Sequence, residues 1–212
     1  MCFNEYVSFG SLIVGTIFNI ILYNKFKSKR MLCIIIMWEW VLLMQFFEGL
    51  IWISNNNKND NMNKICTFCA YLSNILQPII TYLCIMLLTS QPTYSMVFST
   101  IIICVYVAYM IYKYFDHVKD NVNHTNNRDN CNHLVYDWWQ YDSGLVYIIC
   151  LLLIILLAAP HSTFLFQFAI ISITLLIASV TRLNCGTAST WCFLAASAPL
   201  LTLLYHTYIQ TN

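Results

Sequence analysis

The chain has 212 residues, of which 59% are hydrophobic and only 9% are charged. A soluble domain carries about 25% charged residues, so the composition excludes an ordinary water-soluble fold and predicts a membrane protein whose partner is the lipid bilayer. Ten Lys and Arg residues against nine Asp and Glu residues give a formal net charge of +1. We therefore expect no nucleic-acid partner, because phosphate backbones are held by a basic surface.

Seven apolar stretches each approach the roughly 20 residues that a helix needs to cross a bilayer. They run approximately over residues 6–24, 31–54, 65–89, 93–114, 143–159, 162–181 and 187–208. The runs are continuously apolar rather than alternating with period two, which favours helices over a β-barrel. The sequence predicts an all-α fold, with residues 1–212 forming one polytopic seven-transmembrane helical bundle.

The densest positive segment predicts the orientation. Lys25, Lys27, Lys29 and Arg30 lie between the first two stretches, and the positive-inside rule places them in the cytosol. The N-terminus is then expected outside or in a lumen, and the first stretch, which lacks a basic start and a cleavage site, is expected to stay in the mature chain. The opposite side carries more basic residues in total: Lys58, Lys64, Lys113, Lys119, Arg128 and Arg182.

The long loop of residues 115–142 and the cysteines near it lie on the expected outer side. Asn123 begins a glycosylation sequon. Cys131 is a candidate for a disulfide bond with Cys66 or Cys69, because the outer compartment is oxidising; free thiols are the alternative. The Cys66-x-x-Cys69 spacing is also half of a zinc site that Cys131 and His133 would complete, but we expect no metal site.

An aromatic cluster closes this loop, just before the fifth stretch. Its members are Tyr136, Trp138, Trp139 and Tyr141. Tyr and Trp side chains gather at membrane interfaces, so the cluster is expected to anchor the chain in the headgroup zone rather than to bind anything. Residues 55–64, rich in Asn and Lys, are expected to form a connector.

Two glutamates in the second stretch are the strongest functional signal, because a carboxylate near the bilayer centre costs about 2.5–3.5 kcal/mol. Glu39 and Glu48 are nine positions apart, which places them on opposite helix faces and about 13.5 Å apart along the axis. They are therefore not a catalytic pair, which would need to reach one substrate. For Glu39 we expect a hydrogen bond between helices.

Glu48 is the best candidate for a ligand site. On a helical wheel it shares one stripe with Trp38, Val41, Gln45 and Trp52, and Gly49 would let a neighbouring helix approach closely. The functional interpretation is a buried, protonated Glu48 that binds a cation, a proton or a small polar ligand. The alternative is a Glu48 that only holds helices together through hydrogen bonds.

Three seven-spanning classes do not fit the sequence. Rhodopsins need a Schiff-base lysine in the last span, which contains none here, so retinal is not expected as a cofactor, and no other cofactor is indicated. The signature motifs of G-protein-coupled receptors are absent. Ceramidase-like hydrolases hold zinc with several membrane histidines, whereas here only His161 and His206 lie near the membrane, so that chemistry lacks its ligands.

Several short motifs resemble those of another family. The chain opens Met1-Cys2-Phe3, carries Gln45-x-x-Glu48-Gly49-x-x-Trp52 and later has Trp191-Cys192-Phe193. It resembles an uncharacterised family of small multi-pass membrane proteins of bacteria, algae and large DNA viruses, which begin Met-Cys-Phe-Ser; Asn4 departs from that pattern. The resemblance implies that the N-terminal cysteine, the glutamate and the Trp-Cys motif meet in one pocket, and it supplies no activity.

The predicted ligand-binding residues are therefore Cys2, Gln45, Glu48, Trp52, Trp191 and Cys192. Three functions stay open: binding or transport of a cation, proton or small polar ligand; a structural or interaction role in a viral or organellar membrane; and an intramembrane enzyme. The enzyme is the least favoured, because no catalytic constellation is present.

Overall fold

The computed structural model describes residues 4–89, 93–119, 126–127, 134–136, 141–157, 162–181 and 194–211. These residues form seven α-helices: α1 (Glu5–Lys25), α2 (Lys29–Asn56), α3 (Asp60–Leu88), α4 (Thr93–Lys113), α6 (Tyr141–Leu157), α7 (Ser162–Thr181) and α9 (Ala198–Thr211). A π-helical turn η1 (Tyr114–Val118) prolongs α4, and the short strands β1 (Asn126–Asn127) and β2 (Leu134–Val135) pair in antiparallel fashion. The expected all-α architecture is confirmed.

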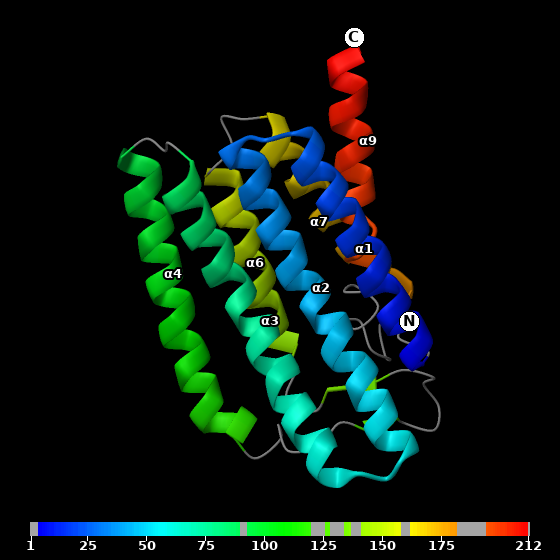
Figure 1. Ribbon diagram of the computed structural model, residues 1–212. Helices are drawn as coiled ribbons and strands as arrows, with labels where there is room; N and C mark the ends of the chain where they lie inside the picture. Colours follow the sequence, from blue (N-terminus) through cyan, green and yellow to red (C-terminus); the bar gives the residue numbers. More distant parts are fainter. Residues whose placement is uncertain are drawn as a thin grey trace.

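The helices form a bundle in which the successive helices α1 to α4 are antiparallel, whereas α9 runs in the same direction as α1 (Figure 1). Helices α1 to α4 follow one another side by side, α6 packs against α3 and α4, and α9 packs against α1. We call the end where α2 turns into α3 the loop end, because β1 and β2 also lie there (Figure 1). The opposite end, where residues 25–30 join α1 to α2, is the basic end.

Helix α2 is the central element of the bundle. More than half (56%) of the most apolar 18-residue stretch of α2 is buried inside the structure, against 22% of the corresponding stretch in α1 and 28% in the α4 segment. Helices α1 and α4 instead expose large apolar side chains on their outer faces, for example Ile17, Ile20, Ile101 and Val105. Such faces match a hydrocarbon environment, and the polar residues of α2 point into the bundle.

In the described part of the chain, four helical segments are long and apolar enough to cross a membrane: Glu5–Lys25, Lys29–Asn56, Asp60–Leu88 and Thr93–Asp116. In the described residues α6 and α7 contribute shorter apolar stretches, 142–157 and 162–178. Helix α9 has 14 residues, or about 21 Å at 1.5 Å per residue, against a bilayer core of about 30 Å. Within the described residues the structure thus supports an integral membrane protein with four such segments, and the seven predicted spans are not all shown.

The start of the last predicted span, residues 187–193, lies outside the described residues. The sequence predicts one helix from about residue 187, and in the described part α9 begins at Ala198, after a turn in which the Ser197 N–H donates to the Leu194 carbonyl at 3.1 Å. Pro199 explains the boundary, because proline lacks a backbone N–H and fits the first turn of a helix, where that N–H has no partner.

The junction between α2 and α3 is shorter than the connector predicted for residues 55–64. Only residues 57–59 lie between the helices. Asn59 caps α3 by accepting a 3.1 Å hydrogen bond from the Met62 backbone N–H, and buried Asn63 donates to Oδ1 of Asn55 at 2.6 Å. Asparagines that pair with each other or cap a helix let both helices continue to the turn.

Candidate functional site

The inner face of α2 carries the polar residues that the sequence singled out. Trp38, Val41, Gln45, Glu48 and Trp52 are all buried, and Gln45 and Glu48 have no exposed surface (0%). Their expected position on one buried face is confirmed.

Both carboxylate oxygens of Glu48 accept hydrogen bonds. Nε2 of Gln45, one helical turn earlier, donates to Oε2 at 2.8 Å. The hydroxyl of Tyr136 donates to Oε1 at 2.6 Å. Glu48 is therefore a buried acidic group held by one donor from its own helix and one donor from outside the helical bundle.

Tyr136 reaches Glu48 from the end of strand β2. Asn127 of β1 pairs with Leu134 of β2, and Leu134 is completely buried while Tyr136 is 6% exposed. The prediction that Tyr136 is an interfacial anchor was wrong: it belongs to the site. The signal that could have revealed this is the apolar segment Leu134-Val135-Tyr136, with residues two apart facing the same side of a strand, inside an otherwise polar loop.

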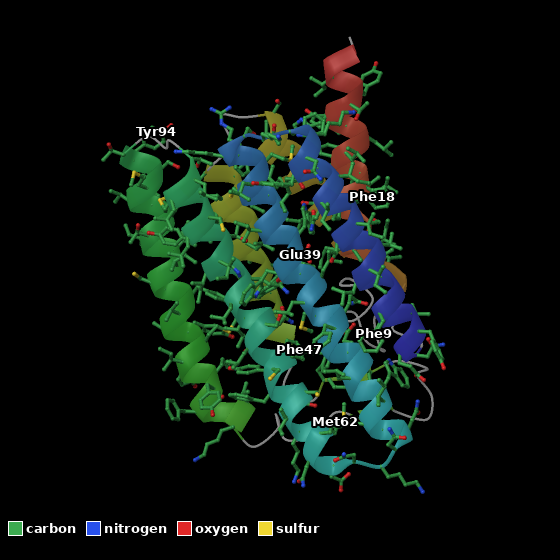
Figure 2. All side chains as sticks on the ribbon, viewed as in Figure 1. Phe9, Phe18, Glu39, Phe47, Met62 and Tyr94 are labelled. Carbon is green, nitrogen blue, oxygen red and sulfur yellow. The ribbon has the colours of Figure 1, made fainter. Side chains whose placement is uncertain are left out.

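Close packing of α1 against α2 adjoins the site. A Cβ atom at Gly49 would lie 2.7 Å from Cζ of Phe9, and one at Gly15 would lie 2.5 Å from Cδ2 of Leu42. The expectation that Gly49 admits a neighbouring helix is confirmed, and the neighbour is α1. Figure 2 shows Phe9 on the part of α1 nearer its N-terminus.

Glu39 is held by α1 and belongs to a separate contact. Thr16 Oγ1 donates to Glu39 Oε1 and Asn19 Nδ2 donates to Glu39 Oε2, each at 2.7 Å. Figure 2 places Glu39 near the middle of α2. The predicted hydrogen bond between helices is confirmed.

The inner face of α3 presents a stripe of buried polar side chains. Ser73, Asn74, Gln77 and Thr81 are at most 3% exposed. Four of their polar atoms, Ser73 Oγ, Asn74 Oδ1, Gln77 Nε2 and Thr81 Oγ1, have no hydrogen-bond partner among the described residues. An unpaired polar group away from water costs about 1–3 kcal/mol, so these atoms call for water, an ion or another polar partner.

The α3 stripe lies nearer the basic end than Glu48 does. Nε1 of Trp40 donates to the Ser73 carbonyl at 2.8 Å, and α2 and α3 are antiparallel, joined at the loop end. Residues after Ser73 on α3 therefore lie beside residues before Trp40 on α2. The polar groups of α2 and α3 form a succession along the bundle axis, from Glu48 and Gln45 to Asn74, Gln77 and Thr81.

Pro78 lies inside α3 within this stripe and removes one backbone hydrogen bond, since it has no N–H to donate to the carbonyl four residues earlier. Neighbouring carbonyls accept from side chains instead: Ile75 from the Tyr106 hydroxyl at 3.0 Å and Ser73 from Trp40. The Tyr147 hydroxyl of α6 donates to Gln77 Oε1. Aromatic side chains from three helices thus donate hydrogen bonds to the part of α3 just before Pro78.

A second buried polar chain joins three helices. Nε1 of Trp38 on α2 donates to Oε1 of Gln167 on α7 at 2.7 Å, and Nε2 of Gln167 donates to Oγ1 of Thr202 on α9 at 3.2 Å. All three residues are buried. Gln167 could not be recognised from the sequence, because one amide in an apolar run has no distinguishing pattern.

The remaining predicted pocket residues are only partly placed. Trp52 is buried beside Glu48 along α2, and its Nε1 has no hydrogen-bond partner in the described residues. Cys2, Trp191 and Cys192 lie outside the described residues. The structure therefore brings Gln45 and Glu48 together, and the meeting with the N-terminal and Trp-Cys segments stays a prediction.

The disulfide, zinc-site and glycosylation predictions for the long loop depend on Cys131, His133 and Asn123. These three residues lie outside the described residues. Cys66 is buried, Cys69 is half-buried, and both are free thiols. No group of three His, Cys, Asp or Glu residues in the described part of the chain is placed to hold a metal ion.

Comparison with known proteins adds no family assignment. No family model, curated protein or solved structure matches the chain.

Proposed function

We propose that the chain is a seven-spanning integral membrane protein, with its N-terminus outside, that binds and transfers a proton at Glu48. The observation that carries this proposal is the completely buried carboxylate, held by Gln45 and by Tyr136 from the loop end. Ionisable residues inside membranes are costly and commonly mark ion or proton pathways.

Of the three ligand classes that Glu48 suits, the proton is favoured by the geometry. Both carboxylate oxygens already accept hydrogen bonds, and the side chain has no exposed surface (0%). A cation or small polar molecule would need room and free oxygen ligands, whereas a proton needs only a change in donor and acceptor roles between Glu48 and its partners.

The unpaired polar atoms of α3 support a path beyond Glu48. A protein whose buried polar groups served packing alone would be expected to pair them with one another. Asn74 Oδ1, Gln77 Nε2 and Thr81 Oγ1 instead lack partners in the part of the chain that the structure describes, and they follow Glu48 in the direction of the basic end. Ordered water bonded to these atoms would provide donors and acceptors for proton movement.

Seven spans and the outer N-terminus are part of the same proposal. Helix α6 packs beside α3 and α4, α7 packs on α6, and α9 packs on α1, so the shorter apolar helices belong to the bundle. An odd number of crossings puts the two ends of the chain on opposite sides, in keeping with α1 starting at the loop end and α9 finishing at the basic end (Figure 1).

A structural role is the second candidate, because each Glu48 oxygen accepts a hydrogen bond and each Glu39 oxygen likewise accepts one from α1. Infrared difference spectra recorded between acidic and alkaline pH, on protein in lipid, distinguish the two. Proton exchange at Glu48 predicts a carboxyl band that changes with pH, shifts in D₂O, disappears in Glu48→Gln and persists in Glu39→Gln. Identical spectra for the wild type and Glu48→Gln would leave the structural role.

A further inference from the structure

The basic end of the bundle is hollowed. A pocket of about 710 Å³ is formed by the connector between α1 and α2, the end of α3, the start of α7 and His206 of α9. Its volume lies within the range of about 300–1,000 Å³ that small-molecule sites occupy. This pocket is at the opposite end of the bundle from the loop end, and no residue of the Glu48 site lines it.

Four cationic residues line this pocket: Lys25, Lys27, Lys29 and Arg30. In the described part of the chain the ion pairs involve Lys113 and leave these four without a carboxylate partner. Lys25 Nζ donates to Thr207 Oγ1 at 2.9 Å, a neutral group. Positive charges that lie together in one pocket without a negative partner repel one another, so the pocket strongly attracts an anion.

Two further groups of the pocket are suited to an anion. Helix α2 begins in the pocket with Ser28 as its N-cap, whose Oγ accepts from the Met31 N–H at 3.1 Å. The N-terminus of this 28-residue helix carries a partial positive charge and free N–H groups. Nε2 of His206 is buried there and has no hydrogen-bond partner within the described ranges.

We propose that this pocket binds a phosphate group, either in the headgroup of an anionic lipid or in a soluble phosphate compound. The planar guanidinium of Arg30 can hold two phosphate oxygens at once, while the lysines act as mobile point charges. The volume exceeds that of a phosphate ion and has room for the glycerol or sugar that a headgroup carries. The position at the end of apolar helices is where lipid phosphates lie.

The test uses the full-length protein in nanodiscs of phosphatidylcholine. One arm adds phosphatidylglycerol to the bilayer and a second adds inorganic phosphate, with binding read by native mass spectrometry and by the shift in thermal unfolding. The double variant Lys29→Gln/Arg30→Gln removes two pocket charges. Lys58→Gln/Lys64→Gln removes two charges at the loop end and is the matched control.

We expect the pocket variant to weaken binding of the phosphate-bearing probe by at least about tenfold, because each charged hydrogen bond contributes more than a neutral one. The control should bind as the wild type does. Binding in the first arm alone identifies a lipid headgroup, and binding in the second arm identifies a soluble phosphate. Absence of binding in both arms, or equal losses in the pocket variant and the control, overturns the proposal.

A second variant keeps the test valid if the charge-neutral variant does not fold. Thr163→Asp places a carboxylate in the same pocket from α7, outside the basic segment, where it would compete with phosphate for the cations. It should also weaken binding by about tenfold. Unchanged binding in a folded Thr163→Asp protein contradicts the proposal.

Discussion

The Tyr136 hydroxyl donates a 2.6 Å hydrogen bond to Oε1 of Glu48 across 88 positions of sequence. This bond joins a segment between two helices to the most deeply buried acid of α2. The hydrogen bond to Glu48 Oε1 therefore depends on the position of residues 134–136, which in turn depends on the pairing of β1 and β2.

The Tyr136→Phe variant tests the contribution of this hydrogen bond to stability. The substitution keeps the ring and removes only the hydroxyl, so Glu48 loses one of two described donors while staying buried. We expect the free energy of unfolding in detergent to fall by about 1–3 kcal/mol. The control is Tyr109→Phe, whose hydroxyl bonds to Asp142 at the surface at 3.1 Å and whose loss should cost less than about 1 kcal/mol. Equal effects of the two variants would show that the Glu48 contact does not stabilise the fold.

The contact between Gly49 and Phe9 predicts a steric effect of Gly49→Ala. The added Cβ would lie 2.7 Å from the ring, so Phe9 must move, and such overpacking costs about 1–3 kcal/mol. The expected readout is lower resistance to denaturation by sodium dodecyl sulfate. Gly10→Ala is the matched control, because nothing lies within 4 Å of a Cβ there, and it should stabilise α1 slightly through the helix propensity of alanine.

The same contact predicts a rescue. Combining Gly49→Ala with Phe9→Leu replaces the ring by a smaller side chain, and the double variant should lose less stability than the two single changes added together. Strict additivity would mean that Phe9 does not pack on Gly49.

The Gln167 bridge predicts coupling between α2, α7 and α9. Gln167→Leu leaves the Trp38 indole and the Thr202 hydroxyl without their shared partner, and hydrogen bonds between membrane helices contribute about 0.6 kcal/mol on average and up to about 1.7 kcal/mol. We expect a loss of about 1–2 kcal/mol in the free energy of unfolding. A double-mutant cycle with Trp38→Phe measures the coupling, and a coupling energy of zero would contradict the described bond.

The helices and the buried face of α2 could be predicted because apolar length and the helical period are local properties of the sequence. The roles of Glu39 and Gly49 also followed, since a carboxylate in a span needs a donor and a glycine admits a neighbour. Tyr136 and Gln167 could not be assigned in this way. Their partners lie 88 and 129 positions away, and no local pattern encodes such pairings.

The number of membrane-spanning helices was the other point that the sequence could not decide. Composition alone does not distinguish an apolar helix of 17 residues, such as α6, from one that is long enough to span by itself. In the same way, the start of α9 is set by Pro199 rather than by the apolar run, which continues on both sides of it.

Proton transfer through Glu48 is tested most directly by proton flux into liposomes that contain the purified protein, followed with an enclosed pH-sensitive dye under an imposed membrane potential. Transfer through Glu48 predicts flux above that of empty liposomes, loss of this flux in Glu48→Gln, and retention in Glu39→Gln, whose carboxylate belongs to the contact with α1. Wild-type flux equal to that of empty liposomes, or flux that persists in folded Glu48→Gln protein, would contradict proton transfer through Glu48.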